Sequence, residues 1–171
     1  MAQDITTLAA LYKGWETYQR HLIQAITPLT AEQLAHSMTP NTHTVGQIAA
    51  HIAFGRATWM HRVMGIKGPE LEKLAQRNWE APEYTTKVAE LVQALEVTWR
   101  ELHNCLERWT LHDIESVFKI EHLGKPYEFS LRWIIWHLIE HDMHHGGELS
   151  FLLGAQGLTA VDLDQIAQVN H

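Results

Sequence analysis

The chain has 171 residues, of which 46% are hydrophobic and 19% charged, and its formal net charge is −7. This length and composition are typical of one globular domain, so we expect a single domain over residues 1–171. The acidic excess argues against nucleic acid as a partner, and the one cysteine, Cys105, excludes an intrachain disulfide and a thiolate metal cage.

Targeting and membrane segments are not evident in the sequence. No stretch approaches the roughly 20 apolar residues of a membrane span. Residues 1–11 lack the continuous apolar run of a signal peptide. We therefore expect a cytoplasmic protein without a membrane partner.

Apolar residues that recur every three or four positions predict four long helices. The first covers residues 4–26, and the second begins after the cap residue Thr44 and ends near Gly65. The third covers about residues 86–109. The fourth begins after Ser130, runs to about residue 153, and is expected to end at Gly154 and Gly157. Four amphipathic helices in a chain of this size predict an all-α four-helix bundle.

Two connections are longer than such a bundle needs. Residues 68–84 join the second and third helices and are expected to contain a short helix over residues 70–79. Residues 115–129 alternate between apolar and polar side chains, and residues 123–126 are typical of a turn, so this segment is expected to form a short hairpin.

Four histidines and a glutamate lie close together on the fourth predicted helix. With a helical step of about 100° per residue, His141 and His145 fall about 40° apart on one face. Their imidazoles can then converge on one point, which is the spacing that helical metal sites use. A wider sector of roughly 100° also includes the other members of the group: His137, His144 and Glu148.

A third ligand should come from another helix, because catalytic metal sites commonly have three protein ligands and an open position. His51 is the best candidate, since it lies between Ile48 and Ile52 on the apolar stripe of the second helix. A single histidine on an apolar stripe is more often a hydrogen-bonded core residue, but the pair of His141 and His145 favours the metal site. His137, His144 and Glu148 are candidates for contacts to ligand residues or to substrate.

The remaining histidines lack convergent spacing, and we expect them to be solvated or structural: His21, His36, His43, His61, His103, His112, His122 and His171. Trp59 and Trp133 fall on apolar stripes and are expected to pack in the core.

A second interpretation of the histidine segment is the helix of zinc peptidases, with Asp142 as the general base. It is disfavoured, because those enzymes place their helix beneath a substantial sheet and need a downstream third ligand. Only Glu148, Asp162, Asp164 and His171 remain in that part of the chain.

Two blocks of the sequence resemble the DinB-like/YfiT-like superfamily of metal-binding four-helix bundles. The first is Thr44-Val45-Gly46-Gln47-Ile48-Ala49-Ala50-His51-Ile52, with Trp59 and Gly65 downstream. The second covers residues 133–149 and includes His141-Asp142-Met143-His144-His145-Gly146-Gly147-Glu148-Leu149. Gly146 departs from the family pattern, which usually has a basic residue at this position.

The resemblance implies His51, His141 and His145 as ligands of a divalent metal, with zinc or nickel the leading candidates, and a homodimer. It also implies a thiol-dependent transferase or isomerase that uses a low-molecular-weight thiol such as bacillithiol or mycothiol. We therefore expect a metal-dependent enzyme acting on a small molecule by transfer, addition or isomerisation. A metal-dependent hydrolase and a non-catalytic metal-binding structural module are the alternatives.

The predicted hairpin leads directly into the fourth helix, and its aromatic residues could line the open metal positions. Tyr127 is the candidate substrate contact among them. Plain packing at the end of the bundle explains these residues equally well. The metal itself is expected near one end of the bundle.

Overall fold

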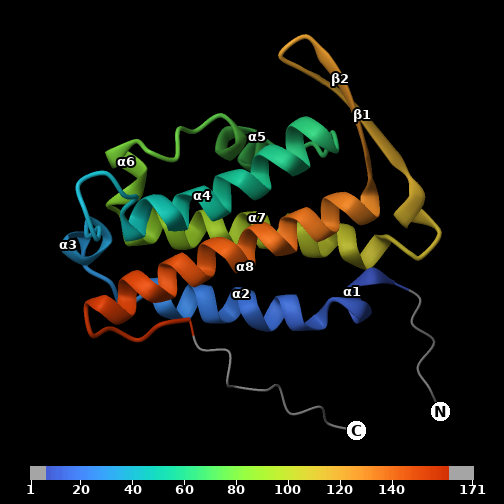
Figure 1. Ribbon diagram of the computed structural model, residues 1–171. Helices are drawn as coiled ribbons and strands as arrows, with labels where there is room; N and C mark the ends of the chain where they lie inside the picture. The colour runs from blue at the N-terminus through green and yellow to red at the C-terminus, as the bar shows by residue number, and fades with distance from the viewer. Residues whose placement is uncertain (1–6, 162–171) are drawn as a thin grey trace, which may run out of the picture.

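Four long helices lie side by side in the computed structural model, which describes residues 7–161 (Figure 1). They are α2 (Lys13–Ile26), α4 (Val45–Thr58), α7 (Val88–Arg108) and α8 (Leu131–Ala155). Shorter helices lie between or before them: α1 (Leu8–Leu11), α3 (Ala31–Leu34), α5 (Pro69–Ala75) and α6 (Pro82–Thr85). The prediction of a mainly helical protein is confirmed.

The helix ends follow local chemistry that is visible in the sequence. The Thr44 hydroxyl accepts from the backbone N–H of Gln47 at 3.2 Å, and the Gln47 side chain accepts from the Thr44 N–H at 2.9 Å. This capping box fixes the start of α4. The same helix continues as a π-helical turn, η1 (Trp59–Val63), and the chain leaves it at Gly65, whose φ is +70°.

Two predicted helix boundaries differ from the structure. The predicted first helix is divided at Tyr12 into α1 and α2, and residues 4–6 lie outside the described part of the chain. Ser130 caps α8 as expected, but Gly154 lies inside the helix, and the left-handed residue after it is Gly157. Helix ends defined by sequence alone are uncertain by such margins.

The segment before α8 forms the predicted hairpin. Strands β1 (Val117–His122) and β2 (Lys125–Ser130) are antiparallel, with Val117 opposite Ser130. Leu123 and Gly124 form the two-residue turn, and both have positive φ, as the right-handed strand twist requires. A 3₁₀ turn, η2 (Asp113–Glu115), precedes the hairpin, which starts at the end of the bundle where α8 begins and projects away from the helices to one side (Figure 1).

The core lies between the long helices and is mainly aliphatic. Small residues let α4 approach its neighbours closely, since Ala49, Ala50, Ala53 and Ala57 are buried. Helix α4 consequently packs against both α7 and α8. None of the helices in the described ranges is long and apolar enough to cross a membrane.

Candidate metal centre

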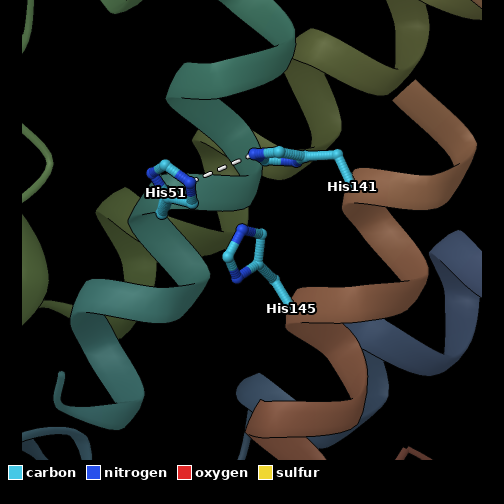
Figure 2. A group of neighbouring side chains, drawn as sticks. All are labelled: His51, His141 and His145. Atoms are coloured by element: carbon cyan, nitrogen blue, oxygen red, sulfur yellow. Dashed lines mark hydrogen bonds between the residues drawn. The ribbon is translucent and has the colours of Figure 1, made fainter. Parts of the chain in front are cut away.

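Three histidines from two helices meet between α4 and α8 (Figure 2). His51 lies midway along α4, and His141 and His145 lie one turn apart on α8. The Nε2 atoms of His51 and His141 are 3.1 Å apart. The His145 ring centroid lies 4.5 Å from that of His51 and 4.6 Å from that of His141. The cluster is therefore near the middle of both helices, and the expectation of a site near one end is wrong.

The spacing of the three imidazoles suits one small cation. Two nitrogens bound to a tetrahedral zinc ion at about 2.0–2.1 Å lie about 3.3 Å from each other. One ligand nitrogen from each of the three histidines lies within 4.8 Å of the others. Small side-chain rotations would bring these nitrogens onto a common ion, so the group could hold a metal.

The protonation of two of these histidines also favours metal binding. Burial, followed by the nearby His145, lowers the pKa of His51 to about 4 and that of His141 to about 3. Both rings are therefore neutral at physiological pH, which is the form that binds a metal. Within residues 7–161, Nδ1 of His51 and Nδ1 of His141 are buried without a hydrogen-bond partner. Hydrogen bonding alone therefore does not explain why the fold gathers these rings.

Gly55 makes room for the His141 ring. A Cβ atom at position 55 would lie 2.9 Å from Cε1 and 3.2 Å from Nε2 of His141. The first distance is shorter than side chains tolerate, so the ring could not keep its present position beside an alanine. Gly55 is one helical turn after His51, and the two residues together shape the α4 side of the site.

Glu148 orients His145. The Nδ1 atom of His145 lies 2.7 Å from Oε2 of Glu148. An ionised carboxylate can only accept, so the proton lies on Nδ1 and leaves the Nε2 lone pair free for a metal. His144 is exposed, and its Nε2 lies 3.6 Å from Oε1 of the same carboxylate. His144, His145 and Glu148 form a second, more exposed group that could hold an ion.

Asp142 faces the protein interior and takes part in a buried ion pair. Its carboxylate accepts from the Arg56 guanidinium, with Nη2 to Oδ2 at 2.6 Å, and from Trp15 Nε1 at 2.7 Å. Arg56 and Asp142 are both fully buried, and Arg56 Nη1 donates to Gln19 at 2.7 Å. Asp142 is therefore held by structural hydrogen bonds, which argues against the peptidase interpretation in which it is the general base.

Gly146 also faces the interior. A Cβ atom at this position would lie 1.6 Å from the Tyr18 hydroxyl oxygen, which donates to the backbone carbonyl of Asp142 at 3.0 Å. A basic side chain at position 146 is incompatible with that contact. Packing against Tyr18 therefore explains why this chain departs from the family pattern at position 146. This position offers no anion contact beside the three histidines.

A row of aromatic rings runs from the hairpin to the site. The His137 ring lies 4.6 Å from Trp59 and 5.0 Å from Trp133, and its centroid is 6.1 Å from that of His141. Trp133 is 42% exposed, so the expectation that it packs in the core is wrong. Phe129 stacks on Trp133 at 4.7 Å.

Tyr127 lies at the far end of this row. Its ring is 40% exposed and stacks on Phe129 at 6.1 Å. Phe129, Trp133 and His137 thus separate it from His141. A direct role of Tyr127 at the metal stays a prediction, and His137 is the nearer candidate for a substrate contact.

Two aromatic residues beside the site were not predicted. The Trp79 ring, from the connection between α5 and α6, lies 4.6 Å from that of His51. His43 was expected to be solvated or structural, and it is exposed. Its ring nevertheless lies 4.8 Å from that of Trp79, which thus contacts both His43 and His51. Trp79 and His43 lie outside the two helices whose spacing selected the three histidines, so that spacing could not place them beside the site. His171 and the acidic residues Asp162 and Asp164 lie outside the described residues.

Comparisons with known proteins agree with this architecture. Residues 15–149 match the family model of the DinB superfamily. A crystal structure of a DinB-like protein from Bacillus cereus ATCC 10987 is similar to the chain, with a TM-score of 0.69 and 20% sequence identity. The match covers 91% of this chain and 96% of that protein. No curated protein matches the sequence.

Proposed function

This chain belongs to the DinB superfamily, and from that premise we propose that it is a metal-dependent enzyme acting on a small molecule. The observation that carries the proposal is the convergence of His51, His141 and His145, with two Nε2 atoms 3.1 Å apart. In this proposal the four long helices form a bundle, and a divalent ion, zinc or nickel, joins α4 to α8.

The leading chemistry is transfer, addition or isomerisation with a low-molecular-weight thiol as cosubstrate. A divalent ion bound by three neutral imidazoles would lower the pKa of a thiol and hold it beside an electrophile. Three protein ligands leave a position for such a molecule.

The chain's own residues have distinct parts in this proposal. Glu148 keeps the His145 proton on Nδ1 and so presents Nε2 to the ion. Gly55 gives the His141 ring its space. Trp79 covers His51 on one side, and His137 with Trp59 forms an aromatic wall beyond His141. These apolar faces limit the access of water to the histidines.

A structural role for the metal is the second candidate, because the ligands come from two helices and a shared ion would link them. Such a module would be strongly stabilised by zinc and would have no turnover. Thermal melting with and without a chelator, together with an activity screen with low-molecular-weight thiols and electrophiles, separates the two candidates. A large loss of stability without any turnover would favour the structural module.

Cobalt-substituted protein provides the direct test of thiol binding. A thiol that reaches the ion should produce a sulfur-to-cobalt charge-transfer band, and His141→Ala should abolish it. His112→Ala is the matched control, because His112 is exposed and belongs to neither histidine group. Absence of the band with every thiol tried, in protein that binds cobalt, would reject the thiol chemistry and leave hydrolysis or the structural module.

A further inference from the structure

A pocket of about 400 Å³ opens near the start of α4, on the side of the histidine cluster where Glu148 contacts His145. Its apolar lining is formed by Met38, Ile48, Phe151 and Leu152. Phe151 and Met38 are 65% and 48% exposed, although both are large apolar side chains. A volume of this size is in the range of small-molecule sites.

Two residues connect this pocket to the candidate metal centre. Glu148 lines the pocket and, at 2.7 Å, accepts from Nδ1 of His145. His43 also lines the pocket, and its ring contacts Trp79, which in turn contacts His51. A molecule held at the histidines therefore has this pocket within reach.

The charge of the lining limits what the pocket accepts. Among residues 7–161, the lining contains one carboxylate, that of Glu148, and neither lysine nor arginine. Position 146 cannot supply a cation either, because Gly146 is packed against Tyr18. An anionic group in the pocket would be repelled by Glu148 and would find no compensating charge, whereas a neutral or cationic group would not.

We infer that this pocket binds the apolar arm of the small molecule that reacts at the three histidines. The ligand class is a neutral or cationic compound with an extended hydrocarbon portion, and anionic substrates are disfavoured. The inference rests on the proposed function for the reacting end of the molecule, but the apolar lining of the pocket is formed by residues that are not candidate metal ligands.

Chain length in a pair of thiols tests the link to the metal. In zinc-loaded protein, 6-mercaptohexanol should bind more tightly than 2-mercaptoethanol by up to about fourfold for each added methylene group, measured by calorimetry. Phe151→Asp should reduce this gain in affinity to less than twofold for each added methylene group. Leu123→Asp makes the same kind of change at an 88% exposed position on the hairpin and should leave the gain intact. Equal affinity of the parent protein for the two thiols would overturn the link.

Probes without a thiol test the pocket separately from the proposed function. In the full-length protein, with and without zinc, hexanol and hexylammonium should shift the amide NMR signals of residues 38–48 and 148–152. In the metal-free form, hexanoate should bind at least tenfold more weakly than these two probes, measured by the same shifts. If hexanol acts on these amides while neither thiol binds, the pocket stands and the thiol chemistry fails. If hexanol leaves these amides unchanged, or hexanoate binds the metal-free pocket as well as hexanol does, the inference is wrong.

Discussion

Replacement of Gly55 should change the zinc affinity of the site without changing the fold. Gly55→Ala should weaken zinc binding by about 10- to 100-fold, because the new methyl group would displace the His141 ring. The helix itself should be unharmed, since alanine favours helices more than glycine does. Competition with a colorimetric zinc chelator measures the affinity, and circular dichroism measures the helix content.

The matched control for this change is Gly14→Ala in α2, where a Cβ atom would have no neighbour within 4 Å. It should leave zinc affinity at the parent value. Equal zinc affinity of Gly55→Ala and Gly14→Ala would show that His141 does not depend on the space beside Gly55.

The low pKa values of His51 and His141 should make the metal-free protein sensitive to acid. Burial holds them near 4 and 3, whereas the same side chains in the unfolded chain titrate near about 6.5. Between these values the unfolded chain binds more protons, so the free energy of unfolding should fall as the pH drops below about 6.5.

The expected loss is up to about 4 kcal/mol between pH 7 and pH 5, about half of it from each ring, measured by urea unfolding of the metal-free protein. His141→Gln removes one of the two groups and should show a clearly smaller loss over the same range. His144→Gln changes an exposed residue and should behave as the parent does. A parent protein equally stable at both pH values would contradict the buried, neutral state of these rings.

The histidines of the site could be predicted from the sequence, but the residues that surround them could not. The helical step brings His141 and His145 together, and the apolar stripe of the second helix points His51 inward. Trp79 and His43 reach the site from connections, whose path depends on tertiary packing. Nothing in the sequence distinguishes Gly55 from other residues of its helix, because its contact with His141 depends on how closely α4 and α8 pack.

Helix α8 is held against α2 and α4 by the buried pair of Arg56 and Asp142. Asp142→Asn should destabilise the protein by about 3–5 kcal/mol, because it leaves the guanidinium charge buried without a counter-charge. Replacing both partners, as in Arg56→Met with Asp142→Leu, should recover more than half of that loss. Urea unfolding of the two variants and the parent measures the difference.

A result in which the double variant is as unstable as Asp142→Asn would contradict this explanation. It would mean that the hydrogen bonds to Trp15 and Gln19, and not the unpaired charge, dominate the contribution of this network.

Most of the helices and strands could be predicted from the sequence, because helix caps and strand alternation are local features. Thr44 and Ser130 precede α4 and α8 as caps, and the alternating segment before α8 forms the hairpin. The one-turn helices α3 and α6 were not predicted, because four residues carry too little periodicity. The π-helical turn after α4 likewise has no sequence signal of its own.

In the molecule as a whole, we propose that one ion links α4 to α8 through His51, His141 and His145. The direct measurement is the zinc content of the purified protein after saturation and removal of free metal. We predict one ion per chain in the parent and in the control His112→Ala, whose exposed histidine belongs to neither histidine group, and less than a tenth of an ion in His51→Ala, with helix content unchanged. One tightly bound zinc per chain in His51→Ala would contradict the claim, because the ion would then not depend on α4.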